Sequence, residues 1–483
     1  MKKKVIIVEP LGSPANVFKR FMFLPLMGPI YLGTILKAAG FEVVVYNENI
    51  MHMGRQSPSR LVDSQEFDLS ILMSKNLQAD FLLLSLLTVS VERGHAIAKV
   101  FRKLNPHGKI IIGGVHPTLL PEESLEFADW VVQGEGEEVI VDLLKYGSSE
   151  KKIVTKHIED LNKIPTPDFS LLSHSSNLPL NKLMSIYPLI TSRGCPFDCS
   201  FCSVTKTFGR KFREVDNQKV IEEISRVQQP NIFFYDDNFT ANKKRIKSLL
   251  EQMIAQNIKK SWSSQNRIDI ANDDELLELM KRSGCTRVHL GIESINDQVL
   301  NNIHKSQTTE QIEMSIKKIH SVGISIHAMF IFGHDFDTPN VFKETIDFCR
   351  RNKIGSLQFL ALTPFPGTET YEKMEKEKRI LHKRWRYYDA LHVVFRPKNI
   401  SASALQQNII SSFDEYYSWS RLVTTAKELF WAIPQTIYQA VYLKRLHYRI
   451  ENFLHNLLAR GIIREWRKLN AHYLNFLNQM FKN

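Results

Sequence analysis

Three of the five cysteines in this 483-residue chain lie within eight residues, and their spacing constrains the chain more than any other feature. Cys195, Cys199 and Cys202 follow a C-x3-C-x2-C pattern inside ITSRGCPFDCSFCSV at 190–204. A loop of this size can place three thiolates around one iron–sulfur cluster. Four-iron clusters that only carry electrons take four cysteines, so three cysteines leave one iron without a protein ligand. The spacing therefore predicts a cluster with an open iron at which a substrate or cofactor binds.

The remaining composition is that of a globular protein in a reducing compartment. The chain is 43% hydrophobic and 24% charged, and clustered cysteines in so cysteine-poor a chain favour metal binding over a disulfide framework. The start MKKKVIIVEP has an apolar run too short for a signal peptide and is typical of a first strand. The apolar segment 429–443 is too short to span a bilayer and is broken by Pro434. We therefore expect a soluble, cytoplasmic protein.

Residues 1–150 alternate between strand-like and helix-like segments, which predicts a doubly wound, Rossmann-like α/β domain. GEGEE at 134–138 is not a dinucleotide fingerprint, because it lacks G-x-G-x-x-G between a strand and a helix. In such sheets ligands bind beyond the carboxyl ends of the strands. The expected strands are 5–8, 41–46, 80–87 and 109–114, and the segment 129–144 is expected to supply a fifth strand, a turn and a helix. The residues at the strand ends are Ser85, Thr88, Gly113, Gly114, Gly134 and Glu135.

A linker is expected over 151–184, where Pro165, Pro167 and a serine-rich stretch interrupt the pattern. Residues 185–400 then repeat strand and helix six times, which predicts a partial (β/α)6 barrel of the TIM type with functional groups at the carboxyl ends of its strands. The expected strands are 187–193, 231–239, 261–270, 286–294, 325–333 and 356–365.

Residues 401–483 are expected to form a helical, basic C-terminal region. Of the chain's formal charge of +12, residues 421–483 contribute +7, from ten Lys/Arg and three Asp/Glu. A solvated helical face explains this excess most simply, and contact with an anionic membrane surface or an acidic partner is the alternative. A stripe at helical spacing is interpreted as a packing face; it consists of Leu446, Ile450, Phe453, Leu454, Leu457 and Leu458.

The cysteine loop, with Phe201 before its last cysteine, resembles that of the radical S-adenosylmethionine (SAM) enzymes. The resemblance extends over about 185–400 and implies a [4Fe-4S] cluster bound by Cys195, Cys199 and Cys202. In that family the open iron holds SAM, and one electron from an external reductant such as flavodoxin or ferredoxin cleaves SAM to a 5′-deoxyadenosyl radical. Cys285 and Cys349 lie away from the loop and are interpreted as small buried hydrophobic residues.

The same resemblance implies SAM contacts at the ends of three later strands. A carboxylate suits the SAM amino group, and a guanidinium suits its carboxylate. Helix capping by the aspartate pair, and an internal salt bridge for Arg267 or Glu293, are the structural alternatives. The implied contacts are Tyr235, Asp236 and Asp237 for the amino end, Gln265 and Arg267 for the carboxylate, and Glu293 and Ser294 for the nucleoside and methionine portion, beside Phe201 in the loop.

The first domain resembles the cobalamin-binding domain that precedes the barrel in one large radical SAM subgroup. The phrases that carry the likeness are LPLMGPIYLGTILKAAGFEVVVYN, SLLT, GGVHPTLLPEE and GEGEE, and they make the strand-end residues from Ser85 to Glu135 the implied cobalamin contacts. The chain departs from many methyl-carrying B12 proteins in having no D-x-H-x-x-G. Cobalamin is therefore expected to bind base-off, without a protein histidine at cobalt.

Three further phrases are similar to the branch that includes the hopanoid methylases: GHDFDTPNVF at 333–342, TPFPGTETYE at 363–372 and RWRYYDALHVVFRPKNIS at 384–401. This likeness marks a branch of methylases and other tailoring enzymes and does not reveal a substrate, which we expect to be a small or lipid-like molecule. The two resemblances together make methylation of an unactivated carbon, through a 5′-deoxyadenosyl radical and methylcobalamin, the leading hypothesis.

Other functions stay open at this point. An oxidative cyclase or rearranging enzyme with the same cofactors is the first alternative, and a non-catalytic cobalamin or iron–sulfur redox protein is the second. A methylthiotransferase is disfavoured because no cysteine precedes Cys195. Nucleic-acid binding is disfavoured because the basic tail lacks an aromatic-basic single-strand motif.

Overall fold

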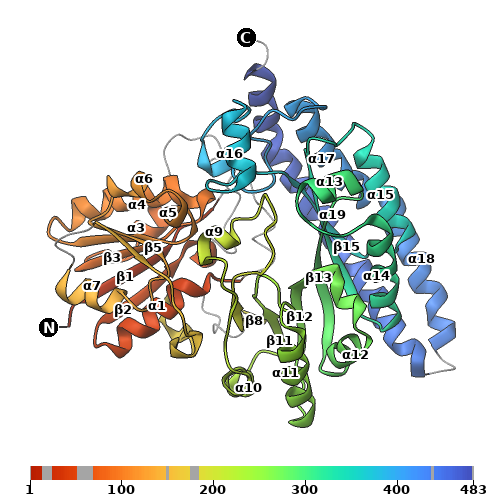
Figure 1. The fold of residues 1–483 in the computed structure, drawn as a ribbon, viewed down its shortest axis with the longest axis horizontal. Helices are drawn as coiled ribbons and strands as arrows, with labels where there is room; N and C mark the ends of the chain where they lie inside the picture. The colour runs from red at the N-terminus through yellow and green to blue at the C-terminus, as the bar shows by residue number, and fades with distance from the viewer. Residues whose placement is uncertain are drawn as a thin grey trace. The chain divides into compact units, whose positions relative to one another are not determined.

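The structure, a computed structural model, describes residues 2–12, 24–51, 69–147, 152–173, 184–436 and 440–480. The chain forms two compact units (Figure 1). The first comprises residues 1–230 together with 364–377 and 383–389, and the second comprises 231–363, 378–382 and 390–483. The cysteine loop therefore belongs to the same unit as the N-terminal sheet.

The first unit is built on a parallel sheet with the strand order β6-β5-β4-β3-β1-β2-β7. The strand order reverses between β1 and β3, which is the switch point where doubly wound sheets bind ligands. The expected α/β fold is thus confirmed. The strands are β1 (Lys4–Glu9), β2 (Glu42–Asn47), β3 (Phe81–Ser85), β4 (Lys109–Gly113), β5 (Trp130–Gly134), β6 (Ile153–Lys156) and β7 (Leu172–Ser173).

The two edge strands come from the segment expected to act as a linker. β6 pairs with β5, and β7 adds two residues beside β2. The central strands are apolar runs such as Val5–Val8, buried from both faces, whereas β6 is partly exposed. A short, polar edge strand leaves a weak sequence signal, because only one of its sides pairs.

Helices cover both faces of this sheet. Helices α1 and α7 lie on one face and α4 on the other (Figure 1). Helix α4 turns Val91, Ile97 and Phe101 inward and leaves Lys99 and Lys103 exposed, as its amphipathic sequence predicts, but it also buries Arg93. The helices of the sheet are α1 (Met27–Ala38), α2 (Glu48–Met51), α3 (Ser70–Met73), α4 (Val91–Leu104), α5 (Val115–Leu119), α6 (Pro121–Leu125) and α7 (Ile140–Tyr146), with the 3-10 turns η3 (Thr88–Ser90), η4 (Leu161–Lys163) and η5 (Phe169–Leu171).

Later segments complete the first unit around the cysteines. Strand β8 (Ile186–Leu189) leads into the short strand β9 (Ser192–Arg193), which pairs antiparallel with β10 (Arg213–Glu214). The cysteine loop and α9 (Val204–Phe208) lie between β9 and β10. The other elements are α10 (Asn217–Arg226), α16 (Glu369–Lys376) and the turn η7 (Trp385–Tyr387).

The second unit contains five parallel strands that pair in chain order, and β8 before them makes six strand–helix repeats along the chain, as expected. The strands are β11 (Asn231–Phe234), β12 (Ser261–Asn266), β13 (Cys285–Glu293), β14 (Ser325–Phe332) and β15 (Ser356–Ala361). The helices are α11 (Lys243–Ala255), α12 (Asp274–Arg282), α13 (Asp297–Asn302), α14 (Thr309–Ser321) and α15 (Val341–Arg351), with the turn η6 (Ile268–Asn272).

The C-terminal region is helical as expected, with α17 (Ala402–Tyr416), α18 (Trp419–Thr436) and α19 (Ala440–Met480). Across the described residues, none of the helices is both long and apolar enough to cross a membrane. The face of α19 that packs inward contains Ala459, Ile463, Trp466, Tyr473 and Leu477.

Four of the six residues in the apolar stripe interpreted as a packing face are exposed instead, while Phe453 is half-buried and the Leu446 side chain lies outside the described residues. Ile450, Leu454, Leu457 and Leu458 are 38%, 49%, 45% and 62% exposed. At 3.6 residues per turn they lie on the side of α19 opposite its packed face. Helical spacing alone could not distinguish the two faces, because α19 is apolar on both sides.

Candidate active site

The cysteine loop is held at both ends in the first unit. The Cys202 N–H donates to the Cys199 carbonyl at 3.0 Å, which closes a tight turn between the last two cysteines. The Thr370 N–H at the start of α16 donates to the Ser200 carbonyl at 3.0 Å. Cys195, Cys199 and Cys202 are half-buried, and none of the five cysteines, all in described residues, forms a disulfide.

Within the described residues, no three His, Cys, Asp or Glu side chains gather closely enough to hold one metal ion. A four-iron cluster needs no such gathering. In a four-iron cluster each cysteine binds a different iron, so the three thiols need to surround a volume, not a point. Phe201, beside the last cysteine, is half-buried. Burial raises the pKa of the Cys285 and Cys349 thiols, as expected for inert core cysteines.

Small residues lie where β3, β4 and β5 end, at the edge predicted to hold cobalamin. Ser85 is paired in register with Gly113, and the Leu86 N–H donates to the Gly113 carbonyl at 2.8 Å. Gly114 has φ +105°, and a Cβ there would lie 2.7 Å from the Leu86 backbone, so only glycine fits. Thr88 is buried at the start of η3. Ser85, Gly113 and Gly114 are small, which would let a large flat ligand lie close to the backbone.

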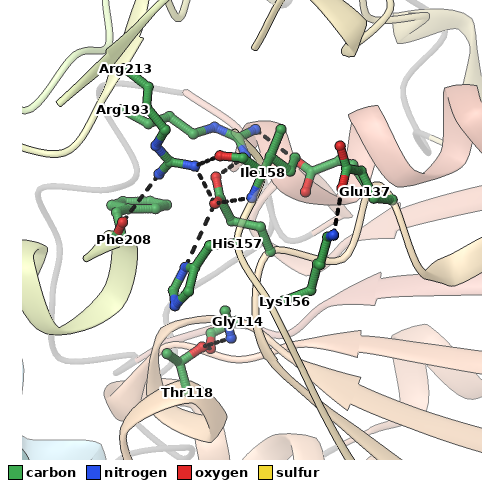
Figure 2. A network of polar contacts seen from close by, with 12 residues as sticks. Gly114, Thr118, Glu137, Lys156, His157, Ile158, Arg193, Phe208 and Arg213 are labelled. Atoms are coloured by element: carbon green, nitrogen blue, oxygen red, sulfur yellow. Dashed lines mark hydrogen bonds and ion pairs between the residues drawn. The ribbon is translucent and has the colours of Figure 1, made fainter. Parts of the chain in front are cut away.

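A hydroxyl links two of these strand ends. Thr118 Oγ1 donates to the Gly114 carbonyl at 2.7 Å and accepts from the Gly134 N–H at 2.9 Å (Figure 2). Gly134 has φ +91°, and a Cβ there would lie 2.2 Å from the Lys156 carbonyl oxygen. The backbone of β5 can therefore turn here only because position 134 is glycine.

Glu135, the next residue, is turned toward the cysteine loop. Its Oε1 accepts from Arg193 Nη1 at 2.7 Å, and its Oε2 accepts from Arg213 Nη1 at 2.5 Å. The Glu135 side chain is 2% exposed. Burial alone would raise the pKa of Glu135, but attraction to Arg193 and the hydrogen bond from Arg213 hold it below its usual value. Glu135 is therefore a buried carboxylate whose two oxygens face arginines.

A second buried ion pair lies at the switch point. Arg93 donates from Nε and Nη2 to the two Glu48 oxygens at 2.6 and 2.7 Å, and both side chains are buried. At the end of β1, Glu9 Oε2 accepts from the Leu26 N–H at 3.0 Å. Sequence reasoning missed these residues, because nothing in the local pattern marks an arginine of α4 as the partner of Glu48.

The segment around η7 also attaches to the first sheet. Trp385 Nε1 donates to Glu123 Oε2 at 2.9 Å, and the same oxygen lies 3.1 Å from His116 Nε2. Arg386 forms an ion pair with Glu92 at 2.5 Å. The hydrogen bond with His116 is the main cause of the lowered pKa of Glu123. The hopanoid-methylase-like phrase at 384–401 thus supplies two anchors to the predicted cobalamin domain.

In the second unit, the ends of β11 and β12 are joined. Gln265 Nε2 donates to the Asp236 carbonyl at 3.4 Å, and the Phe239 N–H donates to the Gln265 carbonyl at 3.0 Å. Asp236 is buried, while Tyr235 and Asp237 are half-buried. Asn242 caps α11 by accepting from the Arg245 N–H at 3.2 Å, so the aspartate pair is not the cap of this helix.

Glu293 combines an ion pair with an unusual backbone. Its Oε1 lies 2.8 Å from Lys305 Nζ, and Arg267 donates from Nη2 to the Lys305 carbonyl. Glu293 has φ +68° and follows a register irregularity between Gly291 and Glu293 in β13. Left-handed backbone at a non-glycine strand end is costly and is concentrated at functional sites. Ser294 is buried beside it, and its Oγ accepts from the Asn296 N–H at 3.1 Å.

Comparison with known proteins decides the family. Residues 189–349 match the radical SAM superfamily, and residues 23–144 match the B12 binding domain. The bacteriochlorophyllide d C-12(1)-methyltransferase of Chlorobaculum tepidum is 32% identical over 328 residues, which cover 65% of this chain and 70% of that protein. The chain belongs to the B12-binding radical SAM enzymes. Its cofactors are accordingly a [4Fe-4S] cluster, SAM and cobalamin.

Other relatives of this B12-binding radical SAM enzyme are named for different activities. The anaerobic magnesium-protoporphyrin IX monomethyl ester cyclase of Rubrivivax gelatinosus is 26% identical, over 80% of this chain and 72% of that one. The hopanoid C-3 methylase of Methylococcus capsulatus is 24% identical, over 62% of this chain and 61% of that one. The expected likeness to the hopanoid methylases is thereby confirmed.

Solved structures share the fold of the B12-binding radical SAM enzymes. The cobalamin-dependent radical enzyme OxsB, with aqua-cobalamin bound, matches with a TM-score of 0.67 at 15% identity, over 98% of this chain and 75% of that one. The methyltransferase TsrM from Kitasatospora setae, with cobalamin and a [4Fe-4S] cluster bound, matches with a TM-score of 0.58 at 16% identity, over 78% of each chain. The order of an α/β domain followed by a radical SAM domain is therefore confirmed.

Within this enzyme the structure brings together only some of the residues predicted for each cofactor. Ser85, Gly113 and Gly134 share one sheet edge, and Arg267 and Glu293 meet through Lys305. The residues that sequence reasoning missed are buried partners far away in the chain, namely Arg93, His116, Arg193, Arg213 and Lys305. A buried arginine or lysine beside a motif is a weak signal in a single sequence.

Proposed function

We propose that this enzyme methylates an unactivated carbon of a small, largely apolar molecule. The observation that carries the proposal is the placement of a three-cysteine loop and a cobalamin-type sheet in one compact unit. When bound, the cluster with SAM supplies hydrogen abstraction, and cobalamin supplies a methyl group. Two relatives are named for a bacteriochlorophyllide and a hopanoid as substrates, which supports an apolar polycyclic acceptor.

The chain's own residues hold and orient the reactants in this proposal. Cys195, Cys199 and Cys202 would hold three irons, and Phe201 beside the last cysteine is a proposed SAM contact. Residues 1–150 would form the cobalamin domain, 151–184 the connection, 185–400 the radical SAM domain and 401–483 the helical region. The proposed SAM contacts are Tyr235, Asp236, Asp237, Gln265, Arg267, Glu293 and Ser294, and the proposed cobalamin contacts are Ser85, Thr88, Gly113, Gly114 and Gly134.

A labelling experiment tests methyl transfer. The anaerobically reconstituted protein, loaded with hydroxocobalamin and supplied with dithionite and SAM carrying a deuterated methyl group, is incubated with bacteriochlorophyllides and with hopanoids. We expect one labelled methyl group in a product, formed together with 5′-deoxyadenosine. The Cys199→Ser variant, treated identically, is the control that should give neither product.

The second candidate is the cyclase reaction, which the magnesium-protoporphyrin relative favours. Conversion of magnesium-protoporphyrin IX monomethyl ester without incorporation of the label would support it and would overturn methylation. Absence of 5′-deoxyadenosine from a protein that retains its iron and SAM would instead favour a non-catalytic binding protein. The reductant in the cell is proposed to be a flavodoxin or ferredoxin, and the place of action the reducing cytoplasm, where thiols of a cluster loop persist.

We also propose that the exposed side of α18 and α19 docks on an anionic membrane surface from which an apolar substrate is taken. Trp419 and Val423 on α18 are 62% and 50% exposed, and Ile450, Leu454, Leu457 and Leu458 on α19 are exposed as well. The Arg460 guanidinium lies 4.1 Å from the Trp419 ring centre. An apolar face with a tryptophan and basic residues, in a region of net charge +7, is typical of interfacial helices.

Vesicle sedimentation tests this surface. We expect co-sedimentation with phosphatidylglycerol vesicles but not with phosphatidylcholine vesicles, and loss of binding in the Leu454→Ser/Leu458→Ser variant. Met314 on α14, 55% exposed and outside this surface, gives the control Met314→Ser. Equal binding of the control and the double variant, or self-association through this surface without vesicle binding, would overturn the proposal.

A further inference from the structure

Two arginines close the cysteine loop at its base. Arg193 on β9 ends the strand just before the loop, and Arg213 on β10 begins the strand just after it. The two residues are paired in register in the antiparallel β9–β10 ladder. Every cysteine of the loop thus lies between them in the chain, and whatever fixes these arginines fixes both ends of the loop.

Both arginines are attached to the predicted cobalamin domain. Arg193 reaches two carboxylates, with Nη1 2.7 Å from Glu135 Oε1 and Nη2 2.6 Å from Glu137 Oε1. Arg213 Nη1 lies 2.5 Å from Glu135 Oε2. The four side chains are between 2% and 7% exposed. Two buried cations and two buried anions form one balanced group, since each charge has an opposite partner within hydrogen-bond distance.

Further contacts leave the arginines little freedom. Arg213 donates to the Ile158 carbonyl after β6 and from Nη2 to the Phe208 carbonyl of α9 at 3.2 Å (Figure 2). The Ile158 N–H donates to Glu135 Oε2 at 2.9 Å. Arg193 also lies over the Tyr31 ring of α1, 5.8 Å from its centre. A guanidinium fork suits this arrangement, because it meets several acceptors at fixed angles.

The network continues to the edge where cobalamin is predicted to bind. Glu135 follows Gly134, whose N–H donates to Thr118 Oγ1, and Thr118 in turn donates to the Gly114 carbonyl (Figure 2). A contiguous series of bonds therefore runs from Gly114 through Thr118 and Gly134 to Glu135 and the two arginines.

We propose that Arg193, Arg213, Glu135 and Glu137 form a positioning clamp that couples cobalamin at the sheet edge to the iron–sulfur cluster in the loop. This inference rests on the proposed function. A ligand that orders the Gly114–Gly134 edge would order the base of the loop through the same bonds, and the cluster would be held more firmly. Such coupling is reciprocal, so a formed cluster would also strengthen cobalamin binding. Glu135 is then a positioning residue and not a cobalamin contact.

The test measures the cluster, not turnover. The reconstituted protein is prepared with and without hydroxocobalamin, and the rate of iron removal by an excess of a chelator is followed by absorbance. In the unaltered protein we expect cobalamin to slow iron loss about fivefold or more. We expect the cobalamin effect to fall below about twofold in two variants. Arg193→Lys keeps the charge but replaces the planar guanidinium, which reaches two carboxylates, with a single ammonium nitrogen. Glu137→Gln removes one of those two carboxylates.

A matched control lies inside the same loop. Arg210 pairs with Asp198 at 3.1 Å, but these side chains are 86% and 63% exposed. Arg210→Gln should therefore retain the full cobalamin effect. Glu137→Gln leaves the Arg193–Glu135 and Arg213–Glu135 pairs in place, so it gives a result even where Arg193→Lys does not fold.

The outcomes separate the clamp from the proposed function. An unchanged cobalamin effect in Arg193→Lys or Glu137→Gln, or no effect in the unaltered protein that has bound cobalamin, overturns the clamp alone. If cobalamin protected the cluster by shielding it directly, the cobalamin effect would stay unchanged in Arg193→Lys and Glu137→Gln. Failure of the unaltered protein to bind hydroxocobalamin would overturn the proposed function and the clamp together. Weaker hydroxocobalamin binding to protein lacking its cluster supports the clamp.

Discussion

Arg193 and Glu135 are 58 residues apart in the chain, yet their side chains meet at 2.7 Å in a buried ion pair. The arginine precedes the first cysteine by two positions, and the glutamate follows the last residue of β5. The pair thereby joins two modules that are recognised separately in sequence. It also explains why the cysteine loop belongs to the same compact unit as the first sheet.

Removing the Glu135 charge should destabilise the first unit. Glu135→Gln would leave Arg193 and Arg213 buried with one carboxylate between them, a change that costs about 3–5 kcal/mol for buried pairs. Denaturant unfolding of the protein without cofactors measures this loss. Arg210→Gln, which breaks an exposed pair, should change the unfolding free energy by less than about 1 kcal/mol. Similar values for the two variants would contradict the buried network.

Each cysteine of the triad should be required for the cluster. We expect Cys195→Ser, Cys199→Ser and Cys202→Ser each to lose most of the iron and the visible absorbance of the reconstituted protein, because a serine hydroxyl is a poor ligand for iron in such clusters. Cys349→Ala, which alters a fully buried core cysteine, should retain both. Retention of a full cluster by any of the three serine variants would remove that cysteine from the proposed ligand set.

Gly291 should be sensitive because of the Glu293–Lys305 pair. A Cβ at position 291 would lie 2.4 Å from Glu293 Oε1 and 3.1 Å from Lys305 Nζ. Both atoms end flexible side chains, so Gly291→Ala should cost little stability but displace the pair. If Glu293 contacts SAM, the dissociation constant for SAM should rise about tenfold, equivalent to 1.4 kcal/mol. Equilibrium dialysis with labelled SAM measures it.

The control for this change is Gly461 in α19, where a Cβ would meet no atom within 4 Å. Gly461→Ala should leave SAM binding unchanged and stabilise the helix by up to about 1 kcal/mol. An unchanged SAM affinity in Gly291→Ala would argue that the Glu293–Lys305 pair is an internal salt bridge and not part of the SAM site.

Asp337 should make stability depend on pH. Burial raises the pKa of Asp337 from 3.8 to about 6, although the Gly333 and His334 N–H groups donate to its Oδ2 at 2.8 and 2.9 Å. Because the folded protein holds the Asp337 proton more tightly than the unfolded chain does, this group contributes stability at pH values below the pKa of the unfolded chain. The contribution is lost as the pH rises through about 6. Across that range the contribution of Asp337 should fall by about 3 kcal/mol.

The variant Asp337→Asn isolates this effect. Relative to the unaltered protein it should gain stability as the pH rises from about 4 to about 7, because asparagine keeps the acceptor without the buried charge. His334, whose pKa burial lowers to about 4, changes in the opposite direction and is common to both proteins. Urea unfolding at several pH values measures the difference. A difference that does not vary with pH would show that Asp337 ionises as in water.

Much of the fold followed from local patterns. The five expected strands of the first sheet contain buried apolar residues, fully so in the core of β1, β3 and β4, and the repeats after Ile186 have strong strand and helix periodicities. The two edge strands were not expected, because β6 and β7 are short and only one side of each pairs. The exposed stripe of α19 was misjudged, because periodicity identifies an apolar face and not its partner.

The sequence by itself determined the chemistry: three closely spaced cysteines that can hold a cluster with an open iron, preceded by a module of the cobalamin-binding type. Such motifs are readable because their residues are neighbours in the chain. Only the tertiary structure decided how the motifs are held. Glu135 forms ion pairs with Arg193 and Arg213, and Glu293 forms one with Lys305. A buried charge is tolerated only beside an opposite charge, and a partner 58 or 78 residues away becomes identifiable only once the chain has folded.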